Sequence, residues 1–188
     1  MMKRGILALA CGGAILAGAG ALAHGGAEGV VKERMEAMKA IADATKAIGE
    51  MLKGATPYDA AAVREQAGVI ASQGGEKLVA MFPKGTDHAP SEAAPAIWSD
   101  PERFAALADE LAAVAEALAE AADNARGPEA MKQAGMMGGG GMTSGAMGSM
   151  MGDGGPSAER LAAMPPEGAF MHLAQTCKAC HQDFRIEK

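Results

Sequence analysis

A chain of 188 residues is long enough for one domain, and its 49% apolar side chains can supply a core. Aromatic residues make up only 3%, Ala, Leu and Met are abundant, and the β-branched residues that favour strands are sparse, so the composition favours helices. The formal net charge of −6 argues against nucleic acid and against anionic membranes as binding partners.

The N-terminal residues 1–23 are typical of a cleaved signal peptide. Lys3 and Arg4 form a short basic region, an apolar stretch follows, and Ala21-Leu22-Ala23 matches an A-x-A cleavage site. A retained membrane helix is the alternative, but the apolar stretch is rich in Gly and polar sequence follows it at once. Cleavage also removes Cys11 and leaves 15 Lys and Arg against 23 Asp and Glu, a charge of −8. We therefore expect an exported, periplasmic protein with no membrane segment after cleavage.

Four stretches of the mature chain have helical periodicity. The first two precede a proline-rich segment at residues 82–99. The first helix is predicted from about Glu28 to Lys53, with an inward face made of Val31, Arg34, Met38, Ile41, Thr45, Ile48 and Leu52. The second is predicted to begin at Thr56-Pro57, where Thr can cap and Pro suits the first turn, and to end at Pro83. Residues 82–99 are expected to form a loop, anchored by Phe82 and Trp98.

The third helix is predicted to begin near Ser99, which has capping-box spacing to Glu102, and to end at Gly127-Pro128. The fourth is predicted to follow Pro165-Pro166 and to carry on one face Phe170, Leu173, Cys177, Cys180 and Phe184. Each amphipathic segment has an apolar stripe that must be covered. We therefore expect an all-α fold, an antiparallel four-helix bundle, formed by residues 24–188 as a single domain.

A Met- and Gly-rich insertion at about residues 128–156 separates the third and fourth helices. We interpret it as flexible, because it cannot bury enough surface to order itself, and we expect a short helical turn after it, from Ser157 to Met164. Thioethers are soft ligands for Cu(I), so a Met-rich copper-binding protein is a less favoured alternative to a linker without a ligand. The methionines concerned are Met131, Met136, Met137, Met142, Met147, Met150 and Met151.

The motif that carries chemistry is Cys177-Lys178-Ala179-Cys180-His181, the C-x-x-C-H signature of covalent haem attachment. Two cysteines three residues apart lie one turn apart on the same helix face, so both sulfurs can form thioethers with the two vinyl groups at one porphyrin edge. The imidazole of His181 can then bind the iron. We therefore expect one haem c, attached at Cys177 and Cys180, with His181 as its axial ligand.

Other interpretations of the motif are less consistent with the sequence. Structural zinc would need four ligands, a thioredoxin-like site would need a strand–helix setting, and a plain disulfide is the simplest remaining alternative. His172 is predicted on the opposite side of the helix from His181, while His24 and His88 are expected to be solvated. No acid–base pair or activated nucleophile can be assigned to one pocket, so we do not expect an enzyme.

With these motifs the chain resembles the class II c-type cytochromes, which comprise cytochrome c′ and low-spin relatives such as cytochrome c-556. The matching segments span nearly all of the mature chain: Arg34 to Lys39, Met81 to Gly85, Ile97-Trp98 and Cys177 to Arg185. The resemblance implies that the haem-binding helix is the fourth of the bundle. It also implies that Arg34 lies near a haem propionate, that Arg185 lies close to the axial imidazole, and that Met38 lies over the distal face.

Two outcomes are open for Met38. If its sulfur binds iron, the haem is six-coordinate and low-spin, and His/Met ligation raises its potential. If Met38 only packs there, the iron is five-coordinate and a distal site can bind NO or CO. Met35 is a second candidate for the sixth ligand.

The resemblance implies a haem protein that acts in electron transfer with redox partner proteins, in binding of NO or CO, or in both. A low-spin electron carrier of the cytochrome c-556 type is the alternative. The family often forms homodimers through its first two helices. Small residues of the second helix that we expect to be exposed would permit such packing: Ala60, Ala61, Ala67 and Gly68.

Overall fold

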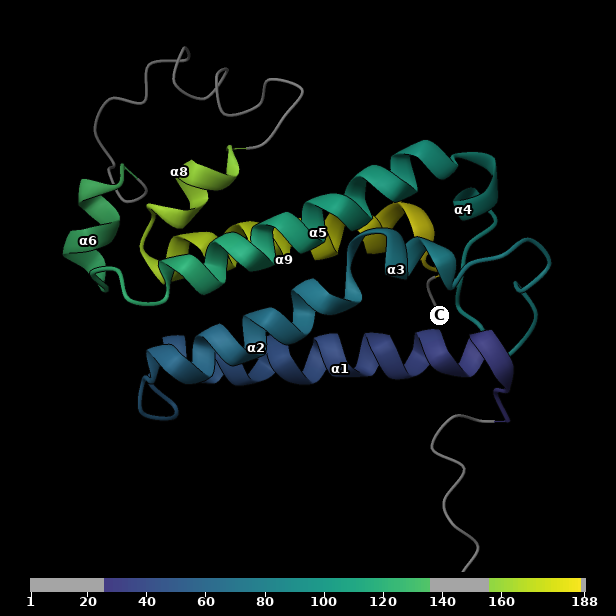
Figure 1. Cartoon of the computed structure of the whole chain (residues 1–188), viewed down its shortest axis with the longest axis horizontal. Helices are drawn as coiled ribbons and strands as arrows, with labels where there is room; N and C mark the ends of the chain where they lie inside the picture. The colour runs from purple at the N-terminus through teal and green to yellow at the C-terminus, as the bar shows by residue number, and fades with distance from the viewer. Residues whose placement is uncertain (1–25, 136–155, 187–188) are drawn as a thin grey trace, which may run out of the picture.

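The computed structural model describes residues 26–135 and 156–186, and every regular element within these residues is a helix (Figure 1). The helices are α1 (Gly29–Leu52), α2 (Ala60–Gln73), α3 (Gly75–Ala80), α4 (Ala96–Ser99), α5 (Pro101–Ala121), α6 (Pro128–Gln133), α8 (Ala158–Ala162) and α9 (Pro166–Phe184). The predicted signal peptide and residues 136–155 of the Met- and Gly-rich insertion lie outside the described residues.

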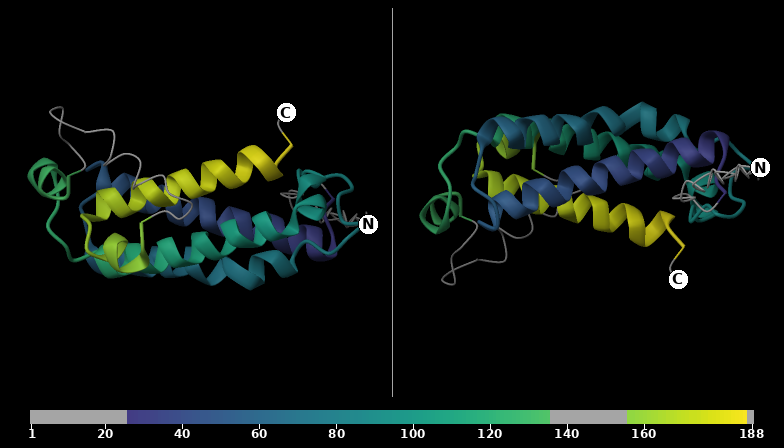
Figure 2. Two further views of the ribbon diagram at one scale, coloured as in Figure 1. Left: turned by 90° about the horizontal axis from the view of Figure 1, so that it is seen from above. Right: turned by 90° about the horizontal axis from the view of Figure 1, so that it is seen from below.

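The bundle consists of four rods, and each rod runs antiparallel to the one before it in the chain. α1 forms the first rod, α2 and α3 together form the second, α5 forms the third and α9 the fourth (Figures 1 and 2). The beginning of α1 and the end of α9 therefore lie at the same end of the molecule, close to α4. The predicted all-α, antiparallel four-helix bundle is confirmed.

Small and medium apolar side chains fill the core. Ile48, Ile70, Leu118 and Leu173, one from each rod, are 0% exposed. α5 packs along α2, α3 and α9, and α1 packs along α2, but α1 meets α9 at only a few points. The bundle is therefore most open between its first and last helices.

The second rod differs from its prediction, because Gly74 divides it into α2 and α3. A Cβ atom at Gly74 would lie 3.0 Å from the backbone nitrogen of Ala112 and 3.2 Å from the backbone oxygen of Ala108, both in α5. Contacts this short are tighter than ordinary van der Waals packing, so a side chain here would require α5 to shift by a few tenths of an ångström. The close approach of α5 therefore favours glycine here, and the helix changes direction at the same residue.

Two helix starts also differ from their predictions. Asp59 caps α2 and accepts hydrogen bonds from the backbone N–H groups of its first turn, whereas Thr56 was expected to do so. Asp100 caps α5 in place of Ser99, and its side chain accepts from the backbone N–H of Arg103. In both cases an aspartate one residue before the helix supplies a stronger acceptor than the hydroxyl further upstream.

Short helices replace parts of two predicted loops. α4 lies within the segment expected to be a loop, and α6 lies at the start of the insertion expected to be flexible, where Met131 is buried with 7% exposure. The predicted turn after the insertion is confirmed by α8, capped by Ser157. The expectation that Ala67 is exposed was wrong, since it is 0% exposed and faces the core. Gly68 and Ala61 are exposed as expected.

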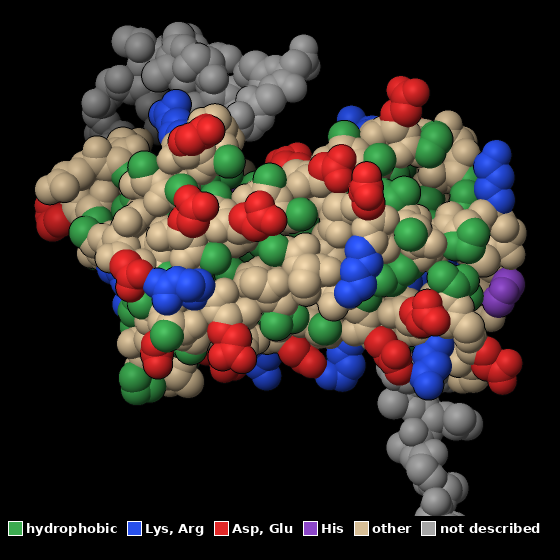
Figure 3. Space-filling model, in the orientation of Figure 1, with side chains coloured by type: hydrophobic (Ala, Val, Ile, Leu, Met, Phe, Trp, Pro, Cys, Tyr) green, Lys and Arg blue, Asp and Glu red, His purple; other side chains and the backbone are tan. Residues whose placement is uncertain are grey.

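Charged side chains of both signs are interspersed over the face of the molecule seen in Figure 3. Within the described residues, none of the helices has the combination of length and apolar character needed to cross a membrane.

Candidate haem-binding site

The last helix places the motif Cys177, Cys180 and His181 on one strip of its surface. Pro166 occupies the first turn of α9 and Glu167 lies beside it, which suits the positive end of the helix dipole. Steps of three and four residues bring the two thiols and the imidazole to the same side of the helix. Both cysteines are half-buried free thiols, so no disulfide joins them.

Two cavities flank this strip. One has a volume of about 130 Å³ and lies toward the end of α9, between α1, α5 and the loop after α3. The other has a volume of about 380 Å³ and lies further along the groove between α1, α5 and α9. Met38, Leu78, Cys180 and His181 line both cavities, so the two are parts of one cleft on the open side of the bundle.

The residues of this cleft fit a covalently attached haem. Two thiols and an imidazole project from one wall, and most of the remaining lining is apolar, including Ile41, Leu107 and Leu111. A porphyrin has a large flat apolar surface, which such walls can bury. Within the described residues, the chain has no cluster of three or more His, Cys, Asp or Glu that could hold a metal ion by itself.

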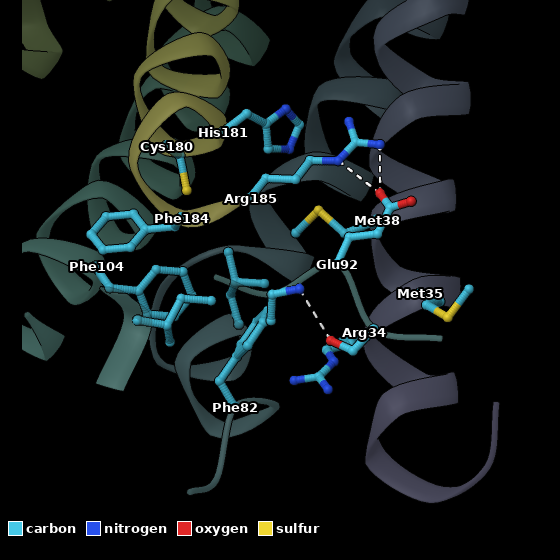
Figure 4. A pocket seen from close by; sticks show the side chains of 14 residues that line it. Arg34, Met35, Met38, Phe82, Glu92, Phe104, Cys180, His181, Phe184 and Arg185 are labelled. Atoms are coloured by element: carbon cyan, nitrogen blue, oxygen red, sulfur yellow. Dashed lines mark hydrogen bonds and ion pairs between the residues drawn. The ribbon is translucent and has the colours of Figure 1, made fainter. Parts of the chain in front are cut away.

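The opposite wall of the cleft is α1. Met38 projects into the cleft toward the wall that bears Cys180 and His181, whereas Met35 lies at the outer edge of the cavity (Figure 4). The predicted placement of Met38 across from the haem motif therefore agrees with the geometry. Whether its sulfur binds iron stays a prediction.

Arg34 lies at the same end of the cleft and is 4% exposed. Its guanidinium donates to the side chain of Thr86, at 3.2 Å, and to the backbone carbonyl of the same residue, and it stacks on Phe82 at 4.8 Å from the ring centre. Burial lowers the pKa of Arg34, while the nearby Asp87 raises it. The cation is therefore held in place at the cavity, as expected of a group near a propionate.

Arg185 follows the end of α9 and has an extended backbone. Its guanidinium donates two hydrogen bonds to one carboxylate oxygen of Glu92, from Nε at 2.9 Å and from a terminal nitrogen at 2.6 Å (Figure 4). Burial lowers the pKa of His181, and the positive charge of Arg185 lowers it further. The imidazole is therefore neutral at pH 7, which is the form that ligates a metal.

The two thiols have pKa values above the ordinary range. Burial raises the pKa of Cys177. Burial, and then the nearby Cys177 and Asp183, raise the pKa of Cys180 to about 11. Both sulfurs are therefore protonated at neutral pH in the chain without haem.

Aromatic residues close the end of the cleft. The rings of Phe82 and Phe104 meet edge to face with centres 4.9 Å apart, and those of Phe104 and Phe184 do so at 5.3 Å. Trp98 donates from its indole nitrogen to the backbone carbonyl of Phe82 at 2.9 Å, so the predicted anchoring of the loop by these two residues is confirmed. Sequence patterns missed Thr86 and Glu92, because both lie in an aperiodic loop and contact residues far away in the chain.

Of the remaining histidines, the two within the described residues lie away from His181, as predicted. His172 lines a separate cavity, with Glu110 and Thr176, and His88 is exposed. His24 lies outside the described residues, as do the insertion methionines after Met131.

Comparison with known proteins agrees with this geometry. The family model described as Cytochrome C' matches residues 29–141, and the chain is 31% identical over 159 residues to cytochrome c′ of Pararhodospirillum photometricum, covering 84% of this chain and 97% of that protein. The chain belongs to the cytochrome c′ family. Proteins of the cytochrome c′ type carry a covalently attached haem c, so this chain is a c-type haem protein.

Solved cytochrome c′ structures share the fold. That of Rhodopseudomonas palustris is 26% identical, with a TM-score of 0.58 over 86% of this chain and 99% of that one. The nitric oxide complex of a cytochrome c′ variant from Alcaligenes xylosoxidans is 25% identical, with a TM-score of 0.54 over 84% of this chain and 94% of that one.

Proposed function

We propose that this cytochrome c′ is a periplasmic protein that transfers single electrons and binds NO or CO at the distal face of its haem, and that it is not an enzyme. The observation that carries the proposal is the cleft between α1 and α9, with Cys180 and His181 on one wall and Met38 on the other. The periplasmic location rests on the predicted signal peptide.

Each residue of the cleft has a separate task in this proposal. Cys177 and Cys180 form the two thioether links, and neutral His181 supplies the axial nitrogen. Arg34, held by Thr86 and Phe82, offers a fixed cation to a propionate. The bound haem supplies a one-electron redox centre and an iron site that can take a diatomic gas.

Met38 decides how the distal face is used. Its thioether is half-buried and faces the wall that bears His181, so it either occupies the sixth position or covers it. The side chains around Met38 on this wall of the cleft are mostly apolar, which suits a small neutral gas better than a charged ligand. The nitric oxide complex of the cytochrome c′ from Alcaligenes xylosoxidans supports gas binding in a protein with the same fold.

The test is the absorption spectrum of ferric protein purified with its covalent haem. A five-coordinate, high-spin spectrum that shifts when NO is added to the reduced protein is the expected result. In Met38→Ala the spectrum should stay high-spin, and CO should bind faster because the covering side chain is gone. A colourless protein with two free thiols, after maturation in a haem-competent periplasm, would contradict the proposal.

The alternative is a low-spin electron carrier of the cytochrome c-556 type, in which Met38 is the sixth ligand. A ferric spectrum with a methionine–iron charge-transfer band that disappears in Met38→Ala would establish this alternative. Met35→Ala is the matched control, since Met35 belongs to the same helix but lies at the edge of the cavity.

We infer a homodimer by resemblance to the family, with α1 and α2 at the interface. Exposed Ala61 and Gly68 of α2 permit close packing of two copies. Sedimentation of the haem-loaded protein tests this inference, and a single species with the mass of one chain would contradict it.

A further inference from the structure

The guanidinium of Arg185 depends on the rest of the protein for its position. α9 ends at Phe184, so Arg185 is outside the helix, and its side chain is 54% exposed. A long side chain at such a place ordinarily samples many rotamers. Here Glu92 accepts two hydrogen bonds from the Arg185 guanidinium, at 2.9 and 2.6 Å, and so holds the side chain in one of these rotamers.

The backbone fixes Glu92 opposite Arg185 independently of the side chains. The N–H of Ile186 donates to the carbonyl of Glu92 at 2.8 Å, and the N–H of Ala94 donates to the carbonyl of Phe184 at 2.9 Å. These bonds form an antiparallel bridge that pairs Ala93 with Arg185. The loop between α3 and α4 is therefore aligned with the end of the haem-binding helix, and the carboxylate of Glu92 has little freedom to move away.

Both residues of this ion pair line the cavity that also contains His181 and Met38 (Figure 4). The same loop holds the other cation of the cavity, Arg34, through Thr86. One aperiodic segment therefore positions both arginines around the haem cleft.

We propose that Glu92 is a positioning residue, which holds the Arg185 guanidinium beside the imidazole of His181 and thereby sets the reduction potential of the haem. This inference rests on the proposed role of His181 as the axial ligand. A cation near the haem favours the ferrous state, because the ferric state carries one more positive charge. Glu92 acts through Arg185 by keeping that cation close.

The sign of the change in potential separates this role from a direct effect of the Glu92 charge. By Coulomb's law alone, removal of a nearby carboxylate raises the potential. If Glu92 instead holds Arg185 in place, Glu92→Ala releases the guanidinium into solvent, and the potential falls. Arg185→Ala should lower it as well, and in the Arg185→Ala background the Glu92→Ala substitution should no longer lower the potential.

Asp183 provides a matched control at the same helix end. It accepts two hydrogen bonds from Arg103, at 2.9 and 2.5 Å, in an ion pair about as exposed as the first. Neither Asp183 nor Arg103 lines the cavity. Asp183→Ala removes the same charge and one anchor of the helix end, so it should leave the potential unchanged or raise it.

The measurement is a redox titration of haem-loaded protein, with the ferric spectrum recorded for each variant. A fall in Glu92→Ala, partly recovered in Glu92→Asp and absent in Asp183→Ala, is expected. A rise or an unchanged potential in Glu92→Ala, or a fall that persists in the Arg185→Ala background, would overturn the proposal. If Glu92→Ala does not fold, the potential of Glu92→Asp is compared with that of Asp183→Ala instead, and a fall in Glu92→Asp alone is expected. Loss of haem attachment in the wild-type chain would contradict the proposed function instead, so the two failures are distinguishable.

Discussion

The thiol of Cys180 shows how strongly its surroundings control the chemistry of a single residue. Its pKa of about 11 lies above the ordinary value because the sulfur is half-buried and close to Cys177 and Asp183. Only the thiolate is a nucleophile. In the chain without haem, folding therefore protects the sulfur at neutral pH.

We predict that alkylation of Cys180 in folded Cys177→Ala protein without haem is slow at pH 8 and accelerates as the pH rises above 9. Burial, the first cause of the raised pKa of Cys180, and the nearby Asp183 both remain in this variant, so its thiolate fraction at pH 8 stays below that of an ordinary thiol. The measurement is the rate of iodoacetamide labelling followed by mass spectrometry, with the same chain in urea as the control. Equal rates in the folded and unfolded chain at pH 8 would refute this prediction.

The residues that sequence could and could not predict differ in how they make contact. Cys177, Cys180 and His181 are adjacent in the chain, so their spacing alone indicates a shared purpose. Arg34 and Met38 follow from helical periodicity combined with the family resemblance. Glu92 contacts a residue 93 positions away through a loop with no period, and no local pattern can predict such a pair.

At the scale of the helices, Gly74 shows why the predicted second helix is in fact two helices, α2 and α3. Periodicity indicates which face of a helix is buried, but it does not indicate how close the neighbouring helix comes. α5 approaches so closely that a Cβ atom at Gly74 would press on its backbone, and the rod divides at this glycine.

Gly74→Ala should therefore destabilise the protein by about 1–3 kcal/mol, because its Cβ would lie 3.0–3.2 Å from backbone atoms of α5, which cannot move aside cheaply. Gly68→Ala is the control in the same rod. Nothing in the same chain lies within 4 Å of its Cβ position, so in the monomer the substitution should stabilise α2 by roughly 0.5–1 kcal/mol. Urea denaturation of the haem-loaded variants measures both effects. A Gly74→Ala protein as stable as wild type would show that α5 shifts freely.

At the scale of the whole molecule, the bundle is open along the face where the cofactor would lie. The sequence predicts the helices and their antiparallel order, because four apolar stripes must cover one another. It does not predict that α1 and α9 meet at few points while α5 packs closely on three helices. A core rich in alanine and poor in aromatic residues leaves a cleft that the helices alone do not close.

We expect covalent haem to contribute much of the cooperative stability of the bundle. Without it, Ile41, Leu107, Leu111 and Met38 line a cleft that holds no apolar partner, and a large unfilled apolar space destabilises a core. Cys177→Ala/Cys180→Ala should keep most of its helix content but lose on the order of 3 kcal/mol or more, and so melt roughly 10 °C lower than the haem-loaded protein. Circular dichroism at 222 nm measures the transition, and binding of an apolar dye reports the exposed cleft.

Wild-type protein made without haem attachment is the control. It keeps both thiols and should melt like the double variant, because the missing haem and not the missing sulfur is the cause. A double variant that melts with the haem-loaded protein would show that the helices close the cleft unaided.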